Sequence, residues 1–255
     1  TEEEELWQNR LMADVNDYLY VRASADADAE IVAGVDTSNH IQNTYPVFGN
    51  IADCNVEADV VIDFCAAPAV DGLLKYCVEK QVPCVLCTTG LSEAQLAAVE
   101  EASKKVAILR SANMSLGVNM LLKILKEAAG ILAPAGFDIE IVERHHNQKL
   151  DAPSGTALAI ADAINEADHN KYEYIYDRHS RSAKRSKHEI GISAVRGGSI
   201  VGDHDVIFAG NNEILEINHR ALSRGIFAEG AIKAAVYLAD KPAGMYDMDK
   251  MVEEL

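Results

Sequence analysis

Over the first 110 residues, the hydrophobic positions form short apolar runs separated by segments with helical spacing. The apolar runs are typical of buried strands and occupy residues 30–36, 59–64, 82–87 and 106–110. Helical spacing predicts helices over 68–79 and 92–104, the second with Ser92 as its N-cap. Apolar strands that alternate with helices indicate a parallel sheet with helices on both faces, which is the outline of a nucleotide-binding α/β fold.

The second half of the chain has a different pattern. A long helix is predicted over 116–132, and a strand that begins near Ile139 leads into a helix that contains 157–164. In that strand, Ile139, Ile141 and Glu143 are expected on one face. Three later segments with glycine-containing turns predict antiparallel strands over 188–198, 199–210 and 213–221. This half therefore reads as an α+β domain with a mixed sheet.

We accordingly expect two domains. Residues 1–113 and 221–255 would form a Rossmann-like domain, with a helix over 224–238 that packs back on its parallel sheet. Residues 114–220 would form the α+β domain. The segment 1–22 also reads as a helix, because its apolar residues recur at helical spacing and four glutamates lie near its start.

The junction between the central strand and helix, IEIVERHHNQKLDAPSGTALAI over 139–160, contains the strongest candidate chemistry. His145 and His146 can each carry or accept a proton near neutral pH, and Lys149 adds a cation. Adjacent histidines on extended backbone point to opposite faces, and the neighbours do not follow an HExxH spacing. We therefore expect acid–base chemistry here and no metal.

The start of the following helix adds an anion site. Asp151 and Ser154 are both good N-caps. Gly155 and Thr156 would open the first turn, where free backbone N–H groups and the helix dipole favour an anion such as a carboxylate. A proton donor, a cation and this anion site within a dozen residues suit a small acidic substrate.

Composition and charge limit the possible partners. A net charge of −17 over 255 residues argues against nucleic acid, although a local cationic pocket can still bind an anionic substrate. No apolar run approaches the length of a membrane span. Five cysteines, an odd number, are best explained as reduced thiols of a cytoplasmic protein. The CxxC formed by Cys84 and Cys87 lies in a strand-like run and favours buried strand residues over zinc or redox chemistry.

The segment ERHHNQKLDAPSGTA resembles the signature of the dihydrodipicolinate reductases, the nicotinamide-dependent enzymes of diaminopimelate and lysine biosynthesis. The resemblance extends from about Asp28 to the C-terminus. It implies that NADH or NADPH reduces 4-hydroxy-tetrahydrodipicolinate, a cyclic dicarboxylate, with loss of water. It also implies a homotetramer built through the mixed sheet, which would be the substrate-binding and oligomerisation domain, beside a dinucleotide-binding first domain.

The same resemblance implies roles for the junction residues. His145 would be the general acid, and Lys149 would assist it electrostatically or as a proton donor. The residues expected to bind substrate, mainly through a carboxylate, are His146, Ser154, Gly155, Thr156 and Arg224, the last matching a family arginine near the active site.

Cofactor contacts are expected at the ends of the parallel strands, where open α/β sheets bind their ligands. By resemblance, two nicotinamide-side loops supply Cys87, Thr88 and Thr89, and Ser111, Ala112, Asn113 and Met114. Asp36 ends the first apolar strand at the position that binds ribose. An acid there accepts bonds from the 2′-hydroxyl and repels a 2′-phosphate, so NADH is weakly favoured over NADPH.

The sequence departs from the family at its start. The first glycine is Gly34, so no glycine-rich phosphate loop can lie upstream of the 30–36 strand. Two explanations stay open: the first residues are not the family's own start, or the chain is a cofactor-deficient paralogue that keeps the fold and the tetramer and binds the cofactor weakly. Another two-domain reductase, such as a semialdehyde dehydrogenase, is a weaker alternative because it lacks the junction signature. The basic segment 178–187 is either a substrate-facing loop or, slightly favoured, a solvated mobile one.

Overall fold

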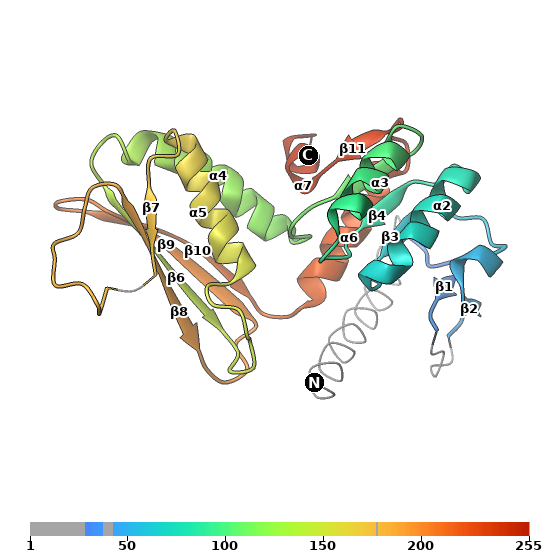
Figure 1. The fold of residues 1–255 in the computed structure, drawn as a ribbon, viewed down its shortest axis with the longest axis horizontal. Coiled ribbons are helices and arrows are strands. Elements are labelled where there is room, and N and C mark those ends of the chain that lie inside the picture. The colour runs from blue at the N-terminus through green and yellow to red at the C-terminus, as the bar shows by residue number, and fades with distance from the viewer. Residues whose placement is uncertain (1–28, 38–42, 177, 255) are drawn as a thin grey trace. The chain divides into compact units, whose positions relative to one another are not determined.

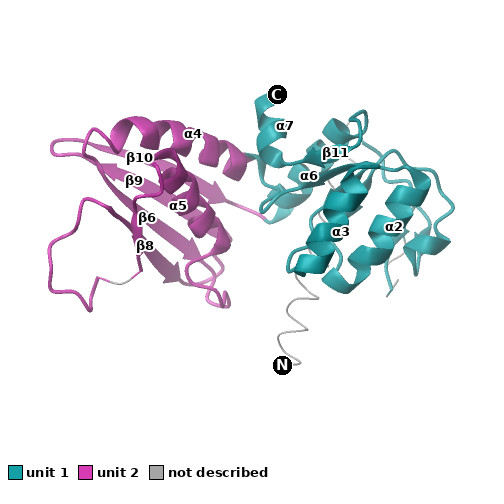
Figure 2. Ribbon diagram, turned by 45° about the horizontal axis from the view of Figure 1, so that its top comes forward, with its two compact units in different colours: residues 1–116, 224–255 teal, residues 117–223 magenta. Residues whose placement is uncertain are grey.

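The structure is a computed structural model that describes residues 29–37, 43–176 and 178–254 (Figure 1). The chain divides into two compact units (Figure 2): unit 1 is Thr1–Leu116 with Arg224–Leu255, and unit 2 is Gly117–Ser223. Both boundaries lie three residues beyond the expected divisions after residues 113 and 220. The helix predicted over 1–22 lies outside the described residues. In the described parts of the chain, no helix is long and apolar enough to span a membrane.

Unit 1 is built on a four-stranded parallel sheet in the order β11-β5-β4-β3. Its strands are β3 (Val61–Asp63), β4 (Cys84–Leu86), β5 (Ala107–Arg110) and β11 (Gly244–Tyr246). One face packs against α2 (Val70–Lys80) and α3 (Glu93–Ser103). The other face packs against α6 (Gly225–Leu238) and α7 (Met248–Glu254). The predicted parallel sheet with helices on both faces is therefore confirmed.

Local sequence explains how α3 begins. The side chain of Ser92 accepts a hydrogen bond from the backbone N–H of Gln95, and the Gln95 side chain accepts one from the Ser92 backbone. This reciprocal capping box satisfies two N–H groups that the first helical turn cannot satisfy itself. The predicted N-cap at Ser92 is confirmed.

The first apolar run is a shorter strand than expected. Only β1 (Gly34–Val35) is a strand within 30–36, and it pairs in parallel with β2 (Val47–Phe48) as a separate two-stranded sheet. Gly34 packs against the ring of Tyr45, to which an added Cβ would come within 3.1 Å. A short 3₁₀ turn, η1 (Ile51–Asp53), follows, and another, η2 (Ala67–Ala69), precedes α2.

Unit 2 contains a five-stranded mixed sheet in the order β10-β9-β6-β8-β7. Its strands are β6 (Asp138–His145), β7 (Glu173–Ile175), β8 (Glu189–Arg196), β9 (Gly202–Ala209) and β10 (Ile214–Ala221). Two helices, α4 (Leu116–Leu132) and α5 (Gly155–Ala167), lie along the same face of the sheet (Figure 1). The core between them is aliphatic around the fully buried Phe208.

One strand prediction was wrong in its partner. β9 pairs antiparallel with both β6 and β10, as expected, but β8 pairs in parallel with β6, which separates β8 from β9. The reason is the connection: parallel neighbours need a crossover, and α5 supplies it between β6 and β8. β7 lies in the polar stretch after α5 and was not predicted.

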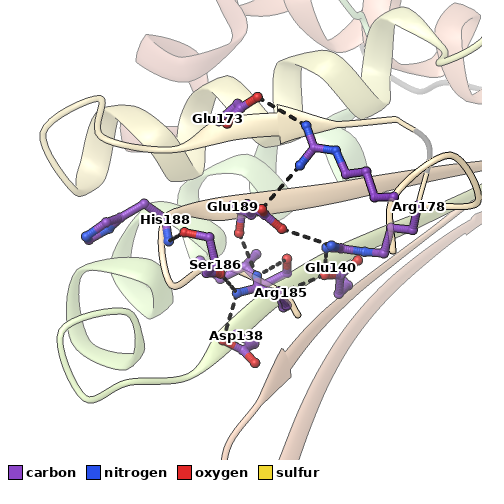
Figure 3. Close-up of polar contacts among 10 residues, drawn as sticks. Asp138, Glu140, Glu173, Arg178, Arg185, Ser186, His188 and Glu189 are labelled. Atoms are coloured by element: carbon purple, nitrogen blue, oxygen red, sulfur yellow. Dashed lines mark hydrogen bonds and ion pairs between the residues drawn. The ribbon is translucent and has the colours of Figure 1, made fainter. Parts of the chain in front are cut away.

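The basic segment is bound to the sheet rather than solvated. Arg178 donates to Glu189 Oε2 at 2.9 Å and to Glu140 Oε1 at 2.5 Å, and Arg185 Nε donates to the same Glu140 oxygen at 3.0 Å (Figure 3). Gly191 pairs with Glu140 across the sheet, and a Cβ there would lie 1.8 Å from Glu140 Oε2. The slightly favoured interpretation of a solvated mobile loop is therefore wrong for these arginines.

Candidate active site

The central strand β6 alternates as expected. Ile139, Ile141, Glu143 and His145 are buried, and the residues between them are partly exposed. Because Glu143 and His145 share the face that is otherwise hydrophobic, their polar atoms must find partners within the protein. The strand therefore carries two apolar residues into the core and then two ionisable residues at its end.

Glu143 is completely buried and satisfied by four contacts. Its Oε2 accepts from Arg196 Nη1 at 2.7 Å and lies 2.6 Å from His145 Nδ1. Its Oε1 accepts from Arg196 Nη2 at 2.7 Å and from the backbone N–H of Ser154 at 3.0 Å. Burial alone would raise the pKa of Glu143, but the bonds from His145, Arg196 and Ser154 outweigh it and lower the pKa to about 2.

Ser154 is the N-cap of α5. Its Oγ accepts the N–H of Ala157 at 3.1 Å and lies 3.2 Å from His204 Nε2. Since that oxygen already accepts, its O–H is free to donate to the unprotonated Nε2 of His204. Burial, followed by the charge of His145, lowers the pKa of His204 to about 4, so this imidazole is neutral near pH 7.

The other predicted cap, Asp151, has a different role. Lys149 Nζ lies 2.8 Å from Asp151 Oδ1. Burial raises the pKa of Asp151, but the Lys149 ammonium and the backbone N–H of Gly155 outweigh it and lower the pKa. A carboxylate of the chain itself therefore lies at the start of α5, between the predicted cation and the predicted anion site.

The remaining junction residues lie around the same helix start. Gly155 is exposed at the first position of α5, Thr156 follows it half-buried, and His146 is half-buried immediately after β6. The loop is tied to the turn after β8, because the N–H of Gly197 donates to His145 O at 2.9 Å. The six predicted junction residues, His145, His146, Lys149, Ser154, Gly155 and Thr156, thus belong to one short segment of unit 2.

The predicted cofactor residues belong to unit 1. Cys87, Thr88 and Thr89 follow β4 at its carboxyl end. The Thr88 hydroxyl is buried, 2.6 Å from Asp63 Oδ2 and 2.8 Å from Cys65 O, so it binds the end of β3 and only its backbone can face a ligand. Burial, followed by the charge of Asp63, raises the pKa of Cys87, which keeps this thiol protonated. All five cysteines are free.

The loop after β5 holds Ser111, Ala112, Asn113 and Met114. It is packed against α6, where a Cβ at Gly230 would lie 1.7 Å from the Met114 carbonyl oxygen. Arg224 is also in unit 1 and immediately precedes α6. Asp36 follows β1 at the surface, and its backbone N–H donates to Phe48 O at 2.9 Å.

Sequence reasoning missed four residues that organise these segments: Asp63, Glu143, Arg196 and His204. Alternation had indicated that Glu143 points inward, which is a signal for a buried acid that needs a partner. Arg196 lies opposite His145 in the β6–β8 register, and His204 lies opposite Glu143 in the β6–β9 register. These pairings join residues more than fifty positions apart in the chain, and no local pattern predicts them.

Comparisons with known proteins agree with this geometry. A model of the dihydrodipicolinate reductase C-terminus matches residues 117–252, and a model of the N-terminus matches 17–114, which begins upstream of the expected Asp28. A 4-hydroxy-tetrahydrodipicolinate reductase of Clostridium tetani is 54% identical over 225 residues, 88% of each chain. One of Caldanaerobacter subterraneus is 52% identical over 232 residues, 91% of each chain.

Solved structures share the fold. A dipicolinate-bound dihydrodipicolinate reductase from Paenisporosarcina matches with a TM-score of 0.78 at 22% identity, over 93% of this chain and 95% of that one. A probable dehydrogenase from Thermotoga maritima matches with a TM-score of 0.54 at 12% identity, over 93% and 90%. At these identities the likeness concerns the fold.

The fold and these matches define a two-domain α/β oxidoreductase of a kind that uses a reduced nicotinamide cofactor. The chain belongs to the dihydrodipicolinate reductase family. The comparisons do not support the alternative of a cofactor-deficient paralogue, since its relatives carry the name of the reductase.

Proposed function

We propose that this protein reduces 4-hydroxy-tetrahydrodipicolinate to tetrahydrodipicolinate in diaminopimelate and lysine biosynthesis, using NADH or NADPH. In this reaction the substrate gains one hydride and one proton and loses one water. The observation that carries the proposal is a histidine held on a buried carboxylate beside a lysine and a helix start, in a chain 54% identical to a relative of that name.

The unit 2 residues would bind and protonate the substrate. His145 is the general acid, because it is the ionisable group at the end of β6 and its Nδ1 is held by Glu143. Lys149 would bind a substrate carboxylate or support the proton transfer. His146, Ser154, Gly155 and Thr156 would hold a carboxylate at the start of α5, where backbone N–H groups favour an anion.

Substrate binding would then exchange one carboxylate for another. Asp151 now pairs with Lys149 and with the Gly155 N–H, the groups that a substrate carboxylate would use. Asp151 is exposed, so it can move into water when the substrate arrives. The dipicolinate bound by the Paenisporosarcina relative is a dicarboxylate, which fits such a site. Arg224 would supply a further cation from unit 1.

The reduced nicotinamide supplies the hydride when it is bound. Unit 1 fits this group through the two loops at the carboxyl ends of β4 and β5, which would offer backbone groups of Thr88, Thr89 and residues 111–114. Asp36 would favour NADH by repelling a 2′-phosphate, which steady-state KM values for NADH and NADPH would measure. A larger KM for NADH than for NADPH would remove that role from Asp36.

We also propose a homotetramer built through the mixed sheet. Both helices of unit 2 lie on one face of that sheet. Large apolar side chains are exposed on its strands, among them Val195 at 44% and Ile214 at 65%. Light scattering coupled to size exclusion would give the mass of a tetramer; a monomeric mass at micromolar concentration would refute this.

The proposed function is tested with the purified chain, substrate and cofactor. We expect reduced nicotinamide to be consumed only when 4-hydroxy-tetrahydrodipicolinate is present, with one product molecule lacking one oxygen atom for each cofactor oxidised. Calorimetric titration with NADH and NADPH checks cofactor binding separately. Binding of either cofactor without turnover of this substrate would show that the chain is an oxidoreductase of another specificity.

A further inference from the structure

Glu143 has no part in the proposed chemistry, yet it is the most completely satisfied carboxylate beneath it. Both oxygens accept from Arg196, and each has a second partner, His145 or the backbone of Ser154. An ionised carboxylate can only accept hydrogen bonds. The ring nitrogen facing it, Nδ1 of His145, must therefore carry a proton, and any change of protonation occurs at Nε2.

The structure leaves space at that second nitrogen. A Cβ added to Gly202 would lie 3.1 Å from His145 Nε2, closer than ordinary van der Waals contact. Any side chain at Gly202 would therefore crowd the nitrogen that exchanges its proton. Glu143 on one side of the ring and Gly202 on the other thus assign different tasks to the two nitrogens.

The other charged groups near the ring oppose its positive form. Arg196 lies opposite His145 on β8, and the His204 ring meets the His145 ring edge-on at a centroid distance of 5.3 Å. Lys149 is a further cation, compensated by Asp151. His219 follows His204 in the strand register, and burial lowers its pKa. Glu143 is thus the carboxylate in contact with the ring.

We propose that Glu143, kept ionised by Arg196, is a positioning residue that holds the His145 proton at Nδ1 and supports the imidazolium, so that Nε2 delivers the proton to the substrate. The proposal rests on the reductase function. In this step one proton leaves Nε2 and joins a substrate carbon, no electrons pass to the protein, and the neutral ring keeps its Nδ1 proton. Water returns the proton to Nε2 after product release.

The first test compares pH profiles of kcat for the wild type and two variants. Glu143→Gln removes the negative charge, so the alkaline limb should move to lower pH by about 1–2 units, with about tenfold slower turnover per unit on that limb. Arg196→Gln removes a neighbouring positive charge, so the limb should move to higher pH. Shifts in the same direction, or none, would overturn the proposal, since a purely structural role lowers kcat without moving the limb.

A matched control comes from the same strand. Glu140→Gln removes a carboxylate that also binds two arginines, but on the outer face of the sheet, and its pH profile should be that of the wild type. A shift as large as that of Glu143→Gln would show a non-specific charge effect and overturn the proposal.

The second test does not depend on activity. Nitrogen-15 NMR of the histidine rings, with the His145 signal assigned by its loss in His145→Gln, reports which nitrogen carries the proton. We expect the neutral ring of His145 to be protonated at Nδ1. Protonation at Nε2 would overturn the inference even in an active enzyme, whereas an inactive wild type with Nδ1 protonated would contradict only the proposed function.

Discussion

A single methyl group at Gly230 tests how unit 1 shapes its cofactor loop. A Cβ there would lie 1.7 Å from the Met114 carbonyl oxygen, and such contacts are essentially never below 3.0 Å, so loop or helix must move by about 1.3 Å. Overpacking of this kind costs about 1–3 kcal/mol, partly offset by about 1 kcal/mol of improved helix propensity. Because Met114 ends the loop expected to face the nicotinamide, a displacement of roughly 1 Å can slow turnover about 10²-fold.

The assay combines urea unfolding with steady-state kinetics, and Gly72→Ala is the control. Gly72 is an exposed glycine in α2 with no atom within 4 Å of an added Cβ. That substitution should stabilise the chain by about 0.5–1 kcal/mol and leave the KM for the cofactor unchanged. Gly230→Ala should lower stability by about 1–2 kcal/mol and impair cofactor kinetics. If the two variants behave alike in both measurements, the close approach of α6 to the loop has been misjudged.

Three further outcomes follow from the structure of unit 2. Thr156→Val should raise the KM for substrate about 10–100-fold with little change in kcat, whereas a loss of thermal stability with unchanged KM would make Thr156 only part of the helix start. Gly191→Ala should cost about 1–3 kcal/mol through its contact with Glu140, and much less in a Glu140→Ala background; an equal penalty in both would exclude that contact. His204 has its pKa lowered to about 4 from 6.5, so the unfolded chain binds the extra proton first. Its contribution to stability is complete above pH 6.5 and lost as pH falls towards 4, up to about 3 kcal/mol, so urea midpoints of His204→Gln should fall less over that range, and an equal fall would contradict this.

Much of the fold could be predicted because the determining signals are local. The helix over 116–132 has the predicted bounds, Ser92 caps α3 with Gln95 as expected, and β6 alternates as its sequence indicates. Each of these depends on residues within one or two turns or strand repeats of one another. The junction chemistry was visible for the same reason, because its groups lie within a dozen residues.

The remainder depends on contacts between distant segments. The parallel pairing of β8 with β6 follows from the crossover through α5, and apolar patterning is the same for either partner. The partner of Glu143 is Arg196, a residue from another strand, so sequence indicated a buried acid without showing what neutralises it. Thr88 was expected at the cofactor, and only the fold shows its hydroxyl bound to Asp63.

The central claim is that this chain is a reductase whose proton donor is His145. It is tested most directly by the rate of reduced-nicotinamide oxidation with 4-hydroxy-tetrahydrodipicolinate, measured for the wild type and for His145→Gln, with circular dichroism to check folding. We predict substrate-dependent turnover by the wild type and a kcat roughly 10²–10⁴-fold lower in the folded variant, the usual contribution of a general acid. Equal rates for the two proteins would remove His145 from the mechanism, and no substrate-dependent oxidation by the wild type would contradict the proposed function.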